Sequence, residues 1–139
     1  MASAGKEFTM KLLVAYNGTK ESEAVLELAK SHSKIFGAKL VVISSSEGGK
    51  GEKLEDINKI KRDLENIQEE LSKNGIECEV EQLARGLTPG EDIVLYAEEN
   101  DIDQIYVGIR KKSRTSKLIL GSTAQFIILK AKCPVTSVK

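Results

Sequence analysis

The chain has 139 residues, of which 30% are charged, and its formal net charge at pH 7 is zero. This length predicts one domain with a core of its own, and the balanced charge argues against a protein that binds nucleic acid over its whole surface. No apolar run approaches the roughly 20 residues that a membrane-spanning helix needs. Residues 1–9 are small and polar and lack the apolar stretch of a signal peptide, so we interpret them as a disordered extension or a cloning remnant before a domain over 10–139.

Strands and helices alternate along this domain. Short apolar runs bounded by turn residues predict five strands, and apolar residues spaced by three and four predict a helix after each of the first four. The expected strands are 11–15, 39–43, 76–83, 104–107 and 134–138, and the expected helices are about 20–36, 54–71, 89–100 and 122–131. Strict alternation indicates an α/β fold, here a single doubly wound domain with a five-stranded parallel sheet of order 3-2-1-4-5 and helices on both faces.

Several residues mark the ends of these elements. Gly37 follows the first helix and can adopt the left-handed conformation that ends one. The run from Thr88 to Glu91 predicts a helix start, because it combines a capping threonine, a proline at the first helical position and a capping-box glutamate. Pro134 suits the first residue of a strand at the sheet edge.

The most informative stretch joins the fourth strand to the last helix. Gly108 ends an apolar run where we expect the chain to turn, and Gly121 opens a helix that Ser122 and Gln125 would cap as an S-x-x-Q capping box. Unpaired amides and a partial positive charge make a helix start a favourable site for phosphate. The loop between these glycines is basic and contains Arg110, Lys111, Lys112, Arg114 and Lys117.

These segments resemble the universal stress protein family. Nucleotide-binding members show Gly, two residues, Gly, nine residues, Gly, and then Ser or Thr. Gly108, Gly121 and Ser122 match this pattern, while Lys111 occupies the second glycine position. Segments 13–19, 84–89 and 131–135 resemble the family's first strand and turn, the loop before its third helix and the entry to its last strand.

The resemblance implies a nucleotide site at the carboxyl ends of the first and fourth strands, which is also where a doubly wound sheet of this order binds ligands. Gly121, Ser122 and Thr123 would hold the phosphates. The residues expected to contact the nucleotide are Ala15, Tyr16, Asn17, Ser45, Val107, Gly108, Arg110, Lys111, Gly121, Ser122 and Thr123. The expected ligand is ATP or another adenine nucleotide, with Mg²⁺ accompanying ATP.

Two of these residues depart from the family pattern and leave alternatives open. Asn17 stands where an aspartate is usual. It can keep at most one of the two sugar hydroxyl bonds that an aspartate would accept, or it is only a turn residue beside Gly18. Lys111 either blocks the phosphate site or adds a compensating charge.

Other chemistries have little support in the sequence. His32 is the single histidine and has no cysteine or carboxylate at ligand spacing, so we predict no metal site. No catalytic triad or nucleophile elbow is present, so we expect no enzyme, with weak or no ATP hydrolysis. Two cysteines, Cys78 and Cys133, lie 55 residues apart and form no disulfide framework, which fits a reducing cytoplasm.

The sequence therefore predicts a cytoplasmic domain that resembles a universal stress protein, binds an adenine nucleotide and regulates a stress response. The alternative is the same fold without nucleotide binding, acting as a dimeric protein-interaction module. Family resemblance implies a homodimer joined through the last strand, Pro134 to Val138, and an unpaired edge strand favours such pairing. We expect no membrane partner, and nucleic acid is disfavoured because no aromatic residues are interleaved with the basic ones.

Overall fold

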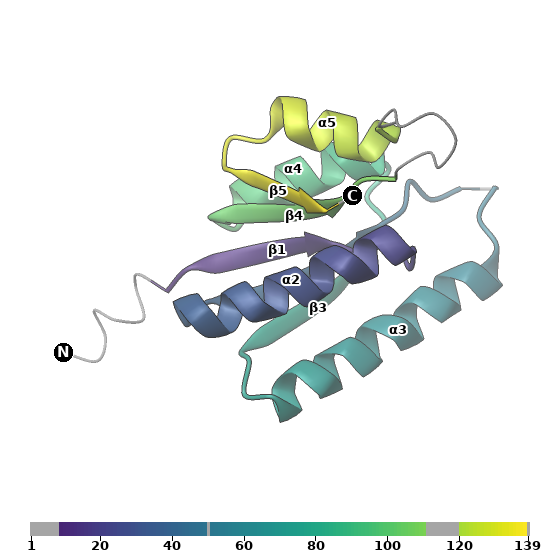
Figure 1. Cartoon of the computed structure of the whole chain (residues 1–139). Coiled ribbons are helices and arrows are strands. Elements are labelled where there is room, and N and C mark those ends of the chain that lie inside the picture. Colours follow the sequence, from purple (N-terminus) through teal and green to yellow (C-terminus); the bar gives the residue numbers. More distant parts are fainter. Residues whose placement is uncertain (1–8, 50, 111–119, 139) are drawn as a thin grey trace.

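The computed structural model describes residues 9–49, 51–110 and 120–138, and Figure 1 shows its elements. All five strands are parallel and form one sheet in the order β3-β2-β1-β4-β5. The strands are β1 (Lys11–Ala15), β2 (Lys39–Ser45), β3 (Cys78–Leu83), β4 (Gln104–Gly108) and β5 (Val135–Val138). The helices are α2 (Lys20–Phe36), α3 (Leu54–Lys73), α4 (Pro89–Glu99) and α5 (Ser122–Lys130). The predicted fold class and strand order are confirmed. Of the predicted extension 1–9, only Thr9 lies within the described residues.

The sheet separates two hydrophobic layers. Helices α2 and α3 cover one face, and α4 and α5 cover the other (Figure 1). Successive residues of the central strand β1 point to opposite layers: Leu12 and Val14 to the first and Leu13 to the second, all with no exposed surface. This double burial explains why β1 appears in the sequence as a continuous apolar run.

Two helix ends form as the sequence predicts. Gly37 caps α2 in the left-handed conformation, with φ of 63° and ψ of 35°. At the start of α4, the Thr88 hydroxyl accepts a hydrogen bond from the amide of Glu91, and the Glu91 carboxylate accepts one from the amide of Thr88. The predicted capping box of α4 is therefore confirmed.

Strand β2 is longer than predicted, and the difference matters for the site. The apolar run ends at Ile43, but Ser44 and Ser45 continue the ladder by pairing with Gln82 and Leu83 of β3. Backbone hydrogen bonding to the neighbouring strand thus extends β2 beyond its hydrophobic residues. As a result, Ser45 stands at the carboxyl end of the strand instead of in a loop.

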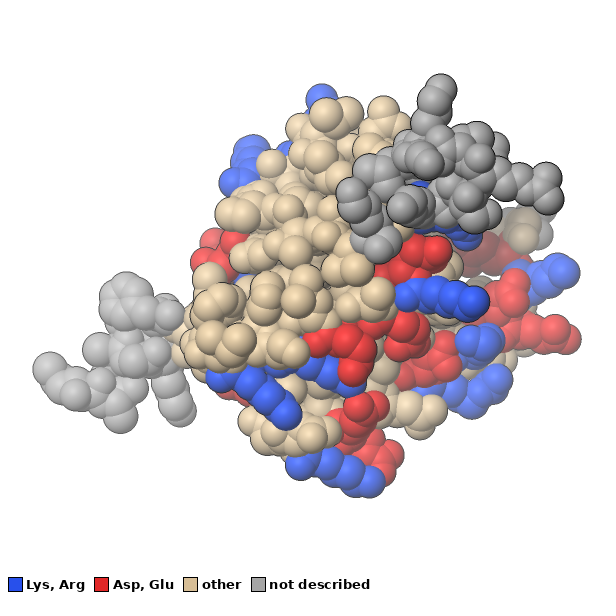
Figure 2. All heavy atoms as spheres, viewed as in Figure 1, with Lys and Arg blue, Asp and Glu red and all other residues tan. Residues whose placement is uncertain are grey.

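Charged side chains of both signs mix over the surface of α2 and α3, as Figure 2 shows. Mixing of this kind on the face shown agrees with the zero net charge. Among the described residues, no helix combines the length and the apolar character needed to cross a membrane.

Candidate functional site

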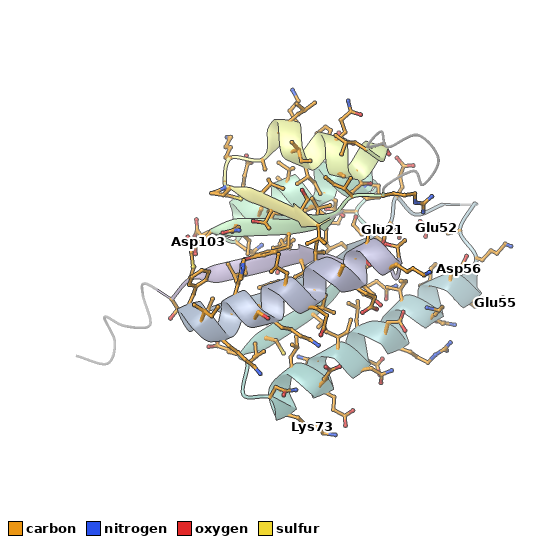
Figure 3. The ribbon with its side chains drawn as sticks, viewed as in Figure 1. Glu21, Glu52, Glu55, Asp56, Lys73 and Asp103 are labelled. Carbon is orange, nitrogen blue, oxygen red and sulfur yellow. The ribbon has the colours of Figure 1, made fainter. Side chains whose placement is uncertain are left out.

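A cavity of about 420 Å³ opens at the carboxyl ends of the strands. Strands β1 and β4 are neighbours at its centre, and the chain leaves them toward opposite faces of the sheet, which makes this the switch point of the doubly wound fold. Figure 3 shows Glu21, which lines the cavity, at the opposite end of the sheet from Asp103. The lining residues are Ala15, Tyr16, Asn17, Thr19, Glu21, Ser22, Ile43, Ser45, Pro89, Ile93, Val107, Gly108, Arg110, Gly121, Ser122, Thr123 and Ala124.

The structure brings ten of the eleven predicted site residues to this one cavity. The eleventh, Lys111, lies outside the described residues, as do Lys112, Arg114 and Lys117 of the basic loop. Within the described part of the chain, Arg110 is the cation that lines the cavity and Glu21 is the anion. Their nucleotide contacts remain a prediction.

The start of α5 differs from the predicted capping box. The helix begins with Ser122 as its first helical residue, so Gly121 is the N-cap, with φ of −65° and ψ of 160°. No side chain of the described residues caps this end, and the first helical hydrogen bond runs from the amide of Gln125 to the carbonyl of Gly121 at 3.0 Å. The S-x-x-Q prediction is wrong because the glycine occupies the position that the serine needed. An uncapped helix start faces the cavity instead, and its amides can hold an anion.

Gly108 is required for a different reason than predicted. It does not turn the chain, because it pairs with Val138 as the last residue of β4. Its backbone lies against the first turn of α2. A Cβ atom built on Gly108 would lie 2.5 Å from the carbonyl carbon and oxygen of Glu21. The glycine therefore permits close packing of α2 on β4, which brings the first turn of α2 to the cavity.

The loop after β1 has its own hydrogen bonds. The side-chain oxygen of Asn17 accepts one from the amide of Thr19 at 3.2 Å and one from the Thr19 hydroxyl at 2.7 Å. The Thr19 hydroxyl in turn caps α2 by accepting from the amide of Ser22 at 3.2 Å. Gly18, with φ of 81°, allows this turn. The arrangement supports the turn interpretation of Asn17, since both lone pairs of its oxygen are engaged.

Tyr16 lines the cavity, but its hydroxyl group bonds elsewhere. The hydroxyl donates to Glu23 Oε1 at 2.7 Å and lies 3.4 Å from Asp63 Oδ2 on α3. Burial, reinforced by the hydrogen bond to Glu23, raises the pKa of the Tyr16 hydroxyl, so it remains a proton donor to that carboxylate. The hydroxyl of Tyr16 therefore interacts with carboxylates of α2 and α3 beneath the site.

A buried carboxylate, Asp92, bonds to cavity-lining Ser45 and pairs with the more exposed Arg85, and sequence reasoning missed this arrangement. Asp92, on α4, is fully buried, and its Oδ1 accepts from Arg85 Nε at 2.6 Å. Arg85 also donates to Glu99 at 2.8 Å, and hydrogen bonds to Glu99 and Asp92 raise the pKa of its guanidinium. The second oxygen of Asp92 accepts from the Ser45 hydroxyl at 2.7 Å. In the sequence, Asp92 resembles an ordinary acidic residue in the first turn of a helix, and its burial depends on tertiary packing.

The structure contains no group of three or more His, Cys, Asp or Glu side chains placed to hold a metal ion among its described residues. His32 lies on α2 with its Nδ1 2.5 Å from the hydroxyl of buried Tyr106. It therefore has a hydrogen-bond partner in the core layer beneath α2.

The fold and the cavity together define a doubly wound α/β domain with a ligand site at its switch point. The chain belongs to the universal stress protein family, whose sequence model matches residues 9–139. The family predicted from the sequence is confirmed.

Similarity to known proteins extends over almost the whole chain. The "Universal stress protein in QAH/OAS sulfhydrylase 3'region" of Thermus aquaticus is 30% identical over 135 residues, covering 92% of this chain and 97% of the relative. The structure of a universal stress protein from Archaeoglobus fulgidus is 37% identical, with a TM-score of 0.82, and the match covers 95% of this chain and 99% of that one. A structure of the universal stress protein from Archaeoglobus fulgidus in complex with dAMP is 32% identical, with a TM-score of 0.74 and coverage of 95% and 98%.

Proposed function

We propose that this domain binds an adenine nucleotide in the cavity at the switch point and acts as a regulatory module in a stress response. The observation that carries the proposal is the start of α5, which has neither a side-chain cap nor an acidic residue in its first turn and which lines the cavity. The complex of an Archaeoglobus fulgidus relative with dAMP supports an adenine ligand. ATP with Mg²⁺, ADP and AMP are the candidates, and we expect little or no hydrolysis of ATP.

From the order of the strands we propose a direction for the ligand. With phosphates on the amides of Ser122 and Thr123, the sugar would cross the end of β1 and the base would reach the end of β2. Strands β4, β1 and β2 are consecutive neighbours, so about 10 Å separate the two outer ones. This distance suits the length of a nucleoside monophosphate. The base would then lie among Ile43, Ile93 and the other lining residues of β2 and α4.

Replacing Gly121 by valine tests this placement. A Cβ at Gly121 meets no atom within 4 Å and the backbone is extended there, so the fold should survive with a capping loss on the order of 1 kcal/mol. The branched side chain beside the helix start should remove binding of ATP and AMP in isothermal titration calorimetry. Gly51→Val is the matched control, because Gly51 also has open space and lies outside the cavity. Unchanged affinity in a folded Gly121→Val protein would place the ligand elsewhere.

A second candidate function is a dimeric protein-interaction module of the same fold that binds no nucleotide. The engaged side-chain oxygen of Asn17 favours it, since that oxygen no longer offers a lone pair to a sugar hydroxyl. The two candidates differ in a simple measurement. If the domain binds nucleotide, absorbance and mass spectrometry of the purified protein should detect retained nucleotide, or added ATP should bind at millimolar concentration or below. If neither occurs, the interaction module becomes the better account.

In either case we propose a homodimer formed through β5. This strand pairs only with β4 among the described residues, so its outer edge is open for a second copy. The carbonyl oxygen of Pro134 accepts a hydrogen bond from the amide of Ile105 in β4, and that of Val138 accepts one from Ile109, the residue directly after β4. Because backbone groups alternate along a strand, Thr136 also faces β4, whereas Ser137 presents its amide and carbonyl to the outer edge. Ser137 is exposed, as a residue at a contact between copies would be in a single chain.

A further inference from the structure

We propose that Ser45, held by Asp92, selects a purine that carries an amino group at its six position, so that the site prefers adenine to hypoxanthine. This inference rests on the proposed nucleotide function and adds the residue that determines its base specificity. It comes from the hydrogen bond that joins a cavity-lining serine to a buried carboxylate.

Ser45 is the polar residue at the end of the cavity where the base would lie. Four of the residues that line this end come from β2 and α4: Ile43, Ser45, Pro89 and Ile93. Three of these side chains are apolar and can pack against the faces of a flat ring. The Ser45 hydroxyl is therefore the side-chain group from these two elements that can distinguish one base edge from another.

Asp92 fixes the direction in which the Ser45 hydroxyl bonds. Arg85 donates to Asp92 Oδ1 from Nε, and its Nη2 lies 2.6 Å from the same oxygen. The other carboxylate oxygen, Oδ2, accepts from Ser45 at 2.7 Å. A carboxylate can only accept, so the single hydroxyl hydrogen of Ser45 is used in this bond. What the hydroxyl oxygen can still offer is a lone pair.

An acceptor at this position discriminates between closely related purines. Adenine has an amino group at position six, which donates a hydrogen bond to such an oxygen. Hypoxanthine has a carbonyl oxygen there, and two acceptors facing each other leave both without a donor. A site whose polar group is left unpaired by the wrong ligand rejects that ligand strongly. AMP and IMP are therefore suitable probes, because they share the phosphate and the sugar.

Asp92→Asn should reverse the polarity of the Ser45 hydroxyl. Arg85 offers only donors, so the amide oxygen of an asparagine would turn toward Arg85 and its NH₂ group toward Ser45. Ser45 would then accept from that NH₂ group, and its own hydrogen would be free to donate to the six-position oxygen of IMP. Ser45→Ala removes the hydroxyl altogether, and it keeps the proposal testable if the change at the buried Asp92 prevents folding.

The experiment measures dissociation constants for AMP and IMP by calorimetry at fixed pH and salt. The native protein should bind AMP about tenfold more tightly than IMP, which corresponds to one hydrogen bond gained and one acceptor left unpaired. Ser45→Ala and Asp92→Asn should each lower this ratio by about fivefold or more. Ser46→Ala is the matched control, because it removes a neighbouring hydroxyl that does not line the cavity, and it should keep the native ratio.

Failure of this inference differs from failure of the proposed function. If the native protein binds AMP but Ser45→Ala retains the full preference over IMP, or if no preference exists, the role of Ser45 is wrong while nucleotide binding stands. If the native protein binds neither AMP nor IMP at millimolar concentration, the proposed function fails and this inference fails with it.

Discussion

Replacing Gly108 by alanine should destabilise the domain and disturb the cavity together. The added Cβ would lie 2.5 Å from two backbone atoms of Glu21 and 2.6 Å from its Cβ, about 0.9 Å inside the 3.4 Å at which ordinary contact begins. Backbone atoms of a helix cannot rotate away as a side chain could. Helix α2 would have to move outward from β4 by nearly this amount.

The expected cost follows from this overlap. Forcing an extra carbon into a close-packed contact costs about 1–3 kcal/mol. Exchange of glycine for alanine stabilises a chain by about 0.4–1 kcal/mol where the backbone conformation suits alanine, so the clash dominates. We expect a net loss of about 1–2 kcal/mol in the free energy of unfolding, which lowers Tm by about 2–8 °C in a domain of this size.

Urea denaturation and nucleotide calorimetry check both parts of this prediction. Gly51→Ala is the control, because it has no neighbour within 4 Å and no positive φ, and it should be neutral or slightly stabilising. Affinity for AMP should fall in Gly108→Ala, since the residues of α2 that line the cavity move with the helix. A Gly108→Ala protein that is as stable as the native one would show that α2 does not lie this close to β4.

Three further predictions concern the dimer, the α4 cap and the turn after β1. Ser137→Pro removes an amide that points away from β4, so this variant should be a monomer in light scattering. Thr136→Pro disrupts the pairing with β4 and should lower the stability of the fold instead. A Ser137→Pro protein that is still a dimer would show that the outer edge of β5 does not form the interface. Hydrogen bonds from Thr88 lower the pKa of Glu91, so its stabilising effect should be present above its ordinary value of 4.5 and disappear as pH falls through the lower folded value. Urea titrations should thus separate Glu91→Gln from the native protein at pH 7 but not in strong acid, and a pH-independent difference would contradict this. Asn17→Asp adds an acceptor oxygen beside the cavity and should tighten AMP binding about fivefold in calorimetry, while an unchanged constant would confine this position to the turn.

The sequence predicts the layers of this fold well because its hydrophobic pattern is consistent over long segments. A strand buried on both faces, such as β1, and a helix with one apolar face, such as α2, leave different spacings in the sequence. Local chemistry at Gly37 and Thr88 then marks helix ends, because each motif needs only neighbouring residues. Alternation of the elements predicts parallel strands, and the doubly wound order predicted for them is the order observed.

The errors lie where distant segments decide the structure. The length of β2 depends on pairing of Ser45 with β3, and the need for glycine at position 108 depends on the approach of α2. Asp92 is buried because Arg85 and Ser45 converge on it from two other segments. A local motif misled the prediction at Ser122, where a serine followed by a glutamine suggested a cap that the structure does not form.

The starts of α2, α4 and α5 all line the cavity, and the differences in their caps indicate that an anion would bind at α5. Helix α2 is capped by Thr19 and carries two acidic residues in its first turn, and α4 has a complete capping box with acidic residues as well. Their amides and partial positive charges are thus already balanced by the chain itself. Helix α5 begins at a glycine, has no side-chain cap and has no acidic residue in its first turn. Among the described residues, α5 is therefore the helix at this cavity whose start a phosphate group would complete.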